Sequence, residues 1–230
     1  MLRNMSGKLE IMTFVQGALE NNCYVISDGA NAFAIDPSYD GEILKKAIAG
    51  AGFELKGVML THFHLDHIDG ILAFEGVRIY MSGKDYDILV SDGVIEYMSE
   101  NFFGRDYMSQ SQIAKIRDFF LKSEIIRVYD GFVMPDFARK IVVWETPGHS
   151  PGSVSYCCED DNTVFTGDTL FFHSYGRIDL PFSNGRQMMK SLDRLSCLPV
   201  GMKVYPGHGA ESTIEEEREY GFLKRMKYED

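Results

Sequence analysis

The potential metal ligands of this chain are concentrated in one short stretch. Three of its six histidines lie within residues 62–67, together with Asp66. Neutral imidazole is the commonest metal-binding side chain in proteins and suits zinc and iron. His62 and His64 are two positions apart, so an extended segment would place both on one side. Asp66 and His67 follow at the predicted turn into a helix beginning near Ile68. The stretch therefore predicts two ligands for one ion and two for a neighbouring ion.

Three further candidate ligands each follow a predicted strand. His149 lies in TPGHSPGS (146–153) and His208 in YPGHG (205–209), where proline and glycine favour tight loops that present a side chain. Asp168 lies in TGDTLF (166–171), and the two oxygens of its carboxylate could bridge two ions. With the first stretch, these residues predict two divalent ions per chain, zinc foremost, with iron or manganese as alternatives.

A different catalytic motif overlaps the His149 loop. Residues 148–152 match the GxSxG pattern of serine hydrolases, in which the backbone N–H after the serine helps to form the oxyanion hole. Here that residue is Pro151, which has no N–H to donate. The pattern therefore does not predict a serine hydrolase.

Two blocks of strands, each with its own helices, would position these residues. In the first block, apolar runs and alternation predict strands at 8–15, 23–27, 32–36, 57–60 and 77–81, with a helix at 40–50. In the second, they predict strands at 125–129, 140–145, 153–157, 163–166 and 203–205, with helices at 185–195 and 211–226. Since no linker separates the blocks, we expect residues 1–230 to form a single domain.

Residues 84–123 form a distinct helical insertion. Aromatic residues and methionine recur there at helical spacing, which predicts two helices with Gly104 between them. The segment either packs against the domain or forms a cap over a substrate pocket.

Composition limits the partners and the location of the protein. The chain has 230 residues with 23 basic and 34 acidic side chains, a net charge of −11. This charge disfavours nucleic acid and anionic membranes as partners and leaves a small-molecule substrate. No signal peptide or membrane span is visible, and the four cysteines form no CxxC pair. We therefore expect a cytoplasmic protein with reduced thiols. The sequence does not indicate an oligomeric state.

These blocks resemble the metallo-β-lactamase superfamily. The resemblance rests on the HxHxDH pattern at 62–67 and the blocks around His149, Asp168 and His208, with residues 35–37 near the start. Within the superfamily, residues 167–171, 176–181 and 206–214 resemble the short glyoxalase II-like group. The resemblance implies an α+β fold, an αββα sandwich of two facing mixed sheets with helices on both outer faces.

The resemblance also implies roles for individual residues. One metal would be held by His62, His64 and His149, and the second by Asp66, His67 and His208, with Asp168 shared between them. The chain ends about twenty residues after His208, without the helical domain that helps full-length glyoxalase II to bind glutathione. Arg177 stands where the family has a lysine and is the candidate for contacting a substrate anion. His173 matches no ligand position.

The leading hypothesis is a binuclear metal-dependent hydrolase of a thioester. A metal-bridged hydroxide would attack the carbonyl, Asp66 would orient it, and the thiolate would leave without needing a proton. The main alternative is a persulfide dioxygenase-like oxidoreductase with one iron on His62, His149 and Asp168. Phosphodiester hydrolysis and a metal-stabilised protein without turnover are weaker alternatives.

Overall fold

The strands form two mixed sheets. The computed structural model describes residues 8–103 and 107–224. The first sheet has the order β1-β2-β3-β4-β5-β6, with β1 (Glu10–Gln16), β2 (Asn21–Ser27), β3 (Asn31–Ile35), β4 (Glu54–Met59), β5 (Ile79–Ser82) and β6 (Ile125–Val128). The second has the order β11-β10-β9-β8-β7, with β7 (Val142–Glu145), β8 (Val154–Cys158), β9 (Thr163–Gly167), β10 (Lys203–Pro206) and β11 (Ser212–Thr213).

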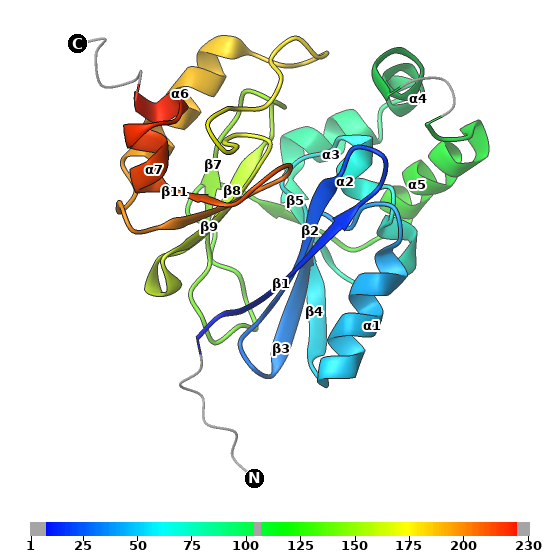
Figure 1. Cartoon of the computed structure of the whole chain (residues 1–230). Helices are drawn as coiled ribbons and strands as arrows, with labels where there is room; N and C mark the ends of the chain where they lie inside the picture. Colours follow the sequence, from blue (N-terminus) through cyan, green and yellow to red (C-terminus); the bar gives the residue numbers. More distant parts are fainter. Residues whose placement is uncertain (1–7, 104–106, 225–230) are drawn as a thin grey trace.

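The helices lie on the outer faces of the two sheets (Figure 1). The chain forms α1 (Gly41–Ala51), α2 (Leu65–Ile68), η1 (Ile71–Phe74), α3 (Gly83–Leu89), α4 (Val94–Met98), the π-helical turn η2 (Ser99–Phe103) and α5 (Gln110–Lys122). Later elements are η3 (Glu159–Asp161), α6 (Gly185–Ser196) and α7 (Ile214–Glu219). Within residues 8–103 and 107–224, no helix combines the length and the apolar composition that a membrane crossing would need.

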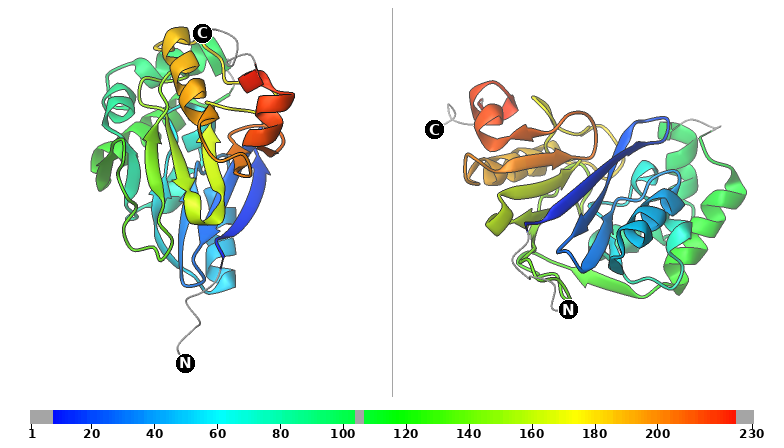
Figure 2. Two further views of the ribbon diagram at one scale, coloured as in Figure 1. Left: turned by 90° about the vertical axis from the view of Figure 1, so that its left-hand side faces the viewer. Right: turned by 60° about the horizontal axis from the view of Figure 1, so that its bottom comes forward.

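Three apolar clusters hold the layers together. One lies between the sheets and joins Phe33 and Tyr80 of the first sheet to Tyr156 and Phe165 of the second. A second packs α1 and α5 on the outer face of the first sheet, and a third packs α6 on the second sheet. Every residue of β2, β8 and β9 is buried, as expected for strands covered on both faces. The molecule is therefore an αββα sandwich, as predicted (Figure 1 and Figure 2).

The insertion at 84–123 differs from the predicted pair of helices. It contains α3, α4, the turn η2 and α5, because Gly93 interrupts the chain in a left-handed conformation before α4. Ser109 then caps α5 by accepting a hydrogen bond from the Gln112 backbone N–H. The predicted break at Gly104 lies outside the described residues.

Two predicted helix boundaries are wrong. The helix expected near Ile68 begins at Leu65, so Asp66 and His67 lie inside α2 and not before it. The C-terminal helix begins at Ile214, not at 211, because Ser212–Thr213 pairs with β10 and Thr213 caps α7 through the Glu216 N–H. This helix ends at Glu219, and residues 225–226 of the predicted helix are outside the described part.

Candidate metal centre

Six of the predicted ligands form two groups of converging donor atoms. His62, His64 and His149 form one group, and Asp66, His67 and His208 form the other. Within each group the donor atoms lie within 4.8 Å of one another. Five of these six side chains are buried, and His208 is partly exposed. The structure thus brings both predicted ligand sets together.

Asp168 lies between the two groups. Its Oδ2 is 3.4 Å from His149 Nε2 in the first group and 3.7 Å from His208 Nε2 in the second. Its Oδ1 is 3.3 Å from His67 Nε2. One carboxylate therefore faces donors of both groups, the placement expected of a ligand shared by two ions.

Several donor atoms are buried without a partner. Among the described residues, the Nε2 atoms of three imidazoles and one carboxylate oxygen have no hydrogen-bond partner and almost no exposure to solvent: His62, His64, His67 and Asp168 Oδ1. Unpaired buried polar atoms are costly, at about 1–3 kcal/mol each. Cations that coordinate these atoms would remove the cost. The donor set therefore fits two divalent metal ions.

The ends of the strands carry these residues to one edge of the sandwich. β4 ends just before residues 61–67, β9 ends at Gly167, and β10 ends at Pro206. His149 lies in the loop between β7 and β8. The loop of His208 also joins the first sheet, since the Asn22 N–H donates to the Gly207 carbonyl at 2.7 Å.

A buried carboxylate orients two of the imidazoles. Asp36 Oδ2 lies 2.9 Å from His67 Nδ1 and accepts a hydrogen bond of 2.6 Å from Thr61 Oγ1. Thr61 Oγ1 in turn lies 3.0 Å from His62 Nδ1. Carboxylates that bind the outer nitrogen of a ligating histidine fix its tautomer and orientation. Asp36 therefore turns the Nε2 atoms of His62 and His67 towards the centre.

Backbone carbonyls orient two other imidazoles. His149 Nδ1 lies 2.8 Å from the carbonyl oxygen of Arg177, and His208 Nδ1 lies 3.0 Å from that of Leu19. His64 differs, because its Nδ1 lies 2.8 Å from His149 Nε2 inside the first group. The Nε2 atoms of His149 and His208 are thereby free to face Asp168.

Gly207 allows the closest backbone approach to the centre. A Cβ atom at this position would lie 2.1 Å from Asp168 Oδ1 and 2.8 Å from His67 Cε1. Any side chain here would displace the shared carboxylate. The glycine before His208 is therefore required by space.

The electrostatics of the centre favour a bound cation. Burial lowers the pKa values of His62 and His64, and the neighbouring imidazoles lower them further. For His67, burial acts in the opposite direction but is outweighed by Asp168, Asp66 and Asp36, so its pKa is raised well above the usual value. Burial likewise opposes, and His67 outweighs, a lowering of the Asp168 and Asp66 pKa values. The carboxylates are therefore ionised at neutral pH and create a negative field that a metal cation would neutralise.

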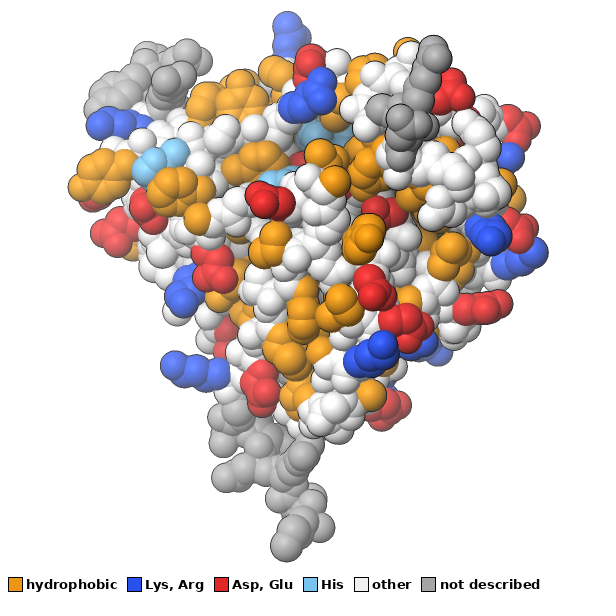
Figure 3. All heavy atoms as spheres, turned by 45° about the vertical axis from the view of Figure 1, so that its right-hand side comes forward, with side chains coloured by type: hydrophobic (Ala, Val, Ile, Leu, Met, Phe, Trp, Pro, Cys, Tyr) orange, Lys and Arg blue, Asp and Glu red, His pale blue; other side chains and the backbone are white. Residues whose placement is uncertain are grey.

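A cavity of about 390 Å³ opens over both donor groups. Its donor-bearing floor includes His64, Asp66, His149, Asp168 and His208. Its other lining residues are Leu19, Phe102, Phe103, Phe171, Arg177 and Leu180. Figure 3 shows imidazole side chains between hydrophobic side chains on the upper part of this face. The size suits a small-molecule substrate.

Arg177 and His173 lie near the centre in different ways. The Arg177 guanidinium lines the cavity and donates to both Asp179 oxygens, from Nε at 2.9 Å and from Nη2 at 3.0 Å. The His173 backbone N–H donates to the carboxylate of Glu217, and its Nε2 lies 3.7 Å from Glu216 Oε1. His173 thus contacts α7, while its ring lies outside the two donor groups.

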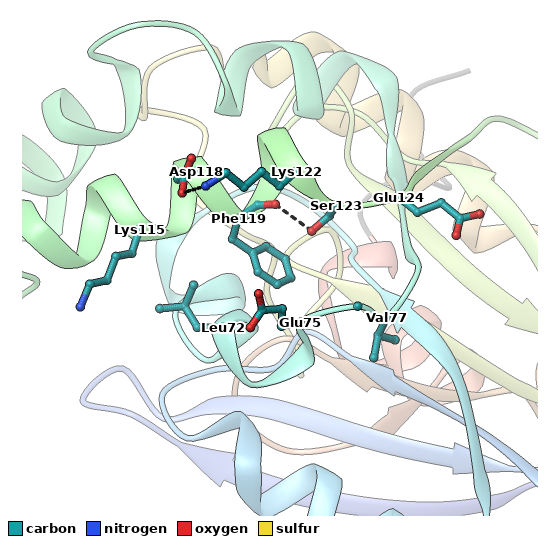
Figure 4. A pocket seen from close by; sticks show the side chains of 10 residues that line it. Leu72, Glu75, Val77, Lys115, Asp118, Phe119, Lys122, Ser123 and Glu124 are labelled. Atoms are coloured by element: carbon teal, nitrogen blue, oxygen red, sulfur yellow. Dashed lines mark hydrogen bonds and ion pairs between the residues drawn. The ribbon is translucent and has the colours of Figure 1, made fainter.

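A larger cavity of about 620 Å³ lies elsewhere, between η1 and α5 (Figure 4). Its lining includes Leu72, Phe119 and charged residues such as Lys122, and none of the donor residues. Lys122 forms an ion pair with Asp118 on its own helix, and Ser123 Oγ donates to the Phe119 carbonyl. Size alone therefore does not identify the functional cavity, and the convergent donors favour the smaller one.

The sequence did not indicate one buried carboxylate that supports the His149 loop. Asp85 of α3 accepts hydrogen bonds of 2.6 Å from Ser150 Oγ and from the Gly152 N–H. Burial raises the pKa of Asp85 to about 7, against the opposing effect of these donors. Because the partners are more than 60 positions apart in the chain, no local pattern could have indicated this contact.

The comparisons with known proteins agree with this geometry. The family model of the metallo-beta-lactamase superfamily matches residues 17–217. A probable metallo-hydrolase of Streptococcus pyogenes serotype M6 is 34% identical over 206 residues, covering 86% of this chain and 83% of the relative. The hydroxyacylglutathione hydrolase GloC of Haemophilus influenzae is 30% identical over 207 residues, covering 87% and 91%.

Two solved structures share the fold over nearly their whole length. The BLEG-1 B3 metallo-beta-lactamase superimposes with a TM-score of 0.77 at 26% identity, covering 93% of this chain and 99% of that chain. TTHA1623 in a di-iron-bound form superimposes with a TM-score of 0.74 at 25% identity, covering 92% and 99%. The chain therefore belongs to the metallo-beta-lactamase superfamily, and its His and Asp clusters are those of a metallo-hydrolase of that superfamily.

Proposed function

We propose that this member of the superfamily is a binuclear metal-dependent hydrolase that cleaves thioesters. The observation that carries the proposal is the position of Asp168 between two convergent donor groups in one cavity. The di-iron form of TTHA1623 supports a pair of ions. The relative GloC supports the bond type, because its name denotes an acylated glutathione as substrate, which is a thioester.

The proposed roles follow from the placement of the donors. His62, His64 and His149 would hold one ion, Asp66, His67 and His208 the other, and Asp168 both. When bound, such ions lower the pKa of water towards neutrality and polarise a substrate carbonyl. Asp66 Oδ2 lies in the cavity, 3.1 Å from His208 Nε2, and can accept a hydrogen bond from the attacking water. Asp66 is therefore the proposed catalytic residue that orients this water. Zinc, iron and manganese all suit these ligands.

The leaving group favours a thioester over an amide or a lactam. A thiolate departs without a proton, whereas an amine nitrogen needs a general acid. The described residues that line the cavity include no lysine, tyrosine or cysteine, and its His and Asp side chains belong to the donor groups. Arg177 is the proposed contact for a substrate anion, in competition with Asp179.

A panel of three reactions tests this proposal on metal-loaded protein. We expect hydrolysis of acylglutathione thioesters, followed by thiol release, with little turnover of a chromogenic cephalosporin. Oxygen uptake with glutathione persulfide and no thioester hydrolysis would instead favour the oxidoreductase. Preferential cleavage of the cephalosporin would refute the thioester assignment.

A further inference from the structure

Apolar side chains from distant parts of the chain surround the donor groups. Phe102 and Phe103 come from the turn η2 of the insertion, Leu19 from the β1–β2 connection, and Phe171 and Leu180 from the segment after β9. All five line the cavity over the metal donors. A substrate whose carbonyl lies at the donors must therefore place its adjoining groups against these side chains.

The two halves of the donor set each lie beside an aromatic ring. The ring centroids of Phe103 and His64 are 6.5 Å apart, on the side of the first donor group. Those of Phe171 and His208 are 5.9 Å apart, on the side of the second. Apolar surface consequently begins directly next to the site where the carbonyl would be attacked.

The aromatic wall is anchored to the ligand-bearing helix. The Phe103 ring packs against Tyr107 with centroids 5.0 Å apart, and Tyr107 Oη donates to Asp69 Oδ2 at 2.9 Å. Asp69 is two positions after His67 and also accepts a hydrogen bond from the Tyr39 N–H. The position of Phe103 relative to the donors is thus fixed through side chains, and the wall is part of the site's architecture.

The charge of the cavity does not select a strongly anionic substrate. Of the described residues that line it, Arg177 is the one lysine or arginine, and Asp179 neutralises its guanidinium through two hydrogen bonds. The net charge of the chain, −11, adds a field that repels anions. Recognition therefore depends mainly on apolar contact.

Apolar surface continues from the cavity onto its rim. Leu19 is 48% exposed, Phe182 is 47% exposed and Ile178 is 38% exposed. The Phe182 ring lies 6.4 Å from that of Phe63, within the HxHxDH stretch, and Ile178 is adjacent to Arg177. An acyl chain longer than the cavity could extend over this rim and remain in apolar contact.

We infer that the site selects thioesters with an apolar acyl group, and that Phe102 and Phe103 determine this specificity. The inference rests on the proposed thioester hydrolysis and adds the chemical class of the acyl group. A short hydroxylated acyl group gains little from the wall, whereas an alkyl or aryl group is removed from water there. Each methylene buried in such contacts strengthens binding by up to about fourfold, given about 0.8 kcal/mol per group.

Matched thioesters test the inference. Glutathione thioesters with lactoyl, acetyl, hexanoyl and phenylacetyl groups would be compared by kcat/KM, with the hexanoyl ester of N-acetylcysteamine to vary the thiol. We expect hexanoyl and phenylacetyl groups to exceed acetyl and lactoyl by about 10-fold or more, mainly through KM. The preference should persist when the thiol is changed.

Variants locate the specificity in the wall. Phe102→Leu with Phe103→Leu should reduce the hexanoyl-to-acetyl ratio by about 10-fold, at unchanged metal content and unfolding temperature. Phe119→Leu is the matched control, because Phe119 belongs to the same insertion and lines the other cavity. It should leave the ratio as in the wild type.

The outcomes separate this inference from the proposed function. Failure to hydrolyse any thioester of the panel would overturn the proposed function. Thioester hydrolysis with lactoyl preferred, or with a preference that follows the thiol, would overturn the acyl inference alone. An unchanged ratio in the double variant would remove Phe102 and Phe103 from specificity.

Discussion

The donor groups and the aromatic wall line the same cavity but are held in different ways. Each of four imidazoles is oriented through its Nδ1 by a buried hydroxyl, a carboxylate or a backbone carbonyl. Phe102 and Phe103 are placed by apolar packing, with one hydrogen bond from Tyr107 behind them. Hydrogen bonds fix direction, whereas packing fixes only position and volume. The donors should therefore tolerate almost no change, while the wall can change and alter specificity without loss of the metals.

Removal of Asp168 should give the largest effect on the donor side. Asp168→Ala takes one ligand from both ions, and we expect kcat/KM to fall by about 10³-fold or more, equivalent to about 4 kcal/mol. Metal content per chain should fall as well. Asp87→Ala is a control, because Asp87 forms an exposed ion pair with Arg127 far from the donors. Normal activity in Asp168→Ala would show that this carboxylate holds no essential ion.

Asp36 tests whether orientation matters as much as ligation. Asp36→Asn keeps the size of the side chain but replaces one acceptor oxygen by a donor, which cannot accept from both Thr61 and His67. We expect metal affinity to fall by about 10–100-fold, as for other carboxylates behind ligating histidines. Competition with a chelator measures this affinity. An affinity equal to that of the wild type would refute the orienting role.

Asp85 gives the donor side a dependence on pH. Its pKa in the folded protein, about 7, lies above the ordinary value of 3.8, so the folded state retains a proton that the unfolded state loses. Its contribution to stability is therefore present at low pH and decreases as pH rises from about 4 to about 7. The decrease should be a few kcal/mol, since one pKa unit corresponds to about 1.4 kcal/mol.

Comparison of wild type with Asp85→Asn isolates this effect. The variant retains an acceptor for the Gly152 N–H but does not titrate, so it should lose this part of the pH dependence. Chemical denaturation at several pH values between 4 and 8 gives the difference, in which other titrations largely cancel. Parallel curves for the two proteins would contradict the raised pKa.

Arg177 should give the smallest effect. Its guanidinium is more than half exposed and already paired with Asp179. Arg177→Gln should therefore raise KM for glutathione thioesters only about two- to threefold, with kcat unchanged, as for other exposed ion pairs. A loss of 100-fold or more would instead make Arg177 a main substrate contact and weaken the case for apolar recognition.

The same contrast explains which features the sequence could predict. The seven donor residues stand in short local patterns, in which residue type and spacing follow from metal chemistry, and the structure brings all of them together. The two sheets were predicted because apolar runs mark buried strands. The start of α2 at Leu65 was missed, since a single helical turn around two ligands has no apolar periodicity.

Features that depend on distant contacts were less accessible. The insertion could be predicted as helical, with packing and a cap over the pocket as alternatives. The structure divides it: Ile113 and Ile116 are buried in the core, while Phe102 and Phe103 line the cavity. Residues 35–37 stood out only by resemblance, and the role of Asp36 became visible through its contacts with Thr61 and His67. Periodicity alone does not distinguish a core aromatic residue from one that faces a substrate.

The most direct test of the account is the number and identity of metal ions per chain, measured by elemental analysis of protein purified without chelator. The account predicts two equivalents of zinc, iron, manganese or a mixture, and close to one equivalent or less in Asp168→Ala. One iron per chain in the wild type, with no second ion bound on addition of excess metal, would contradict the binuclear centre.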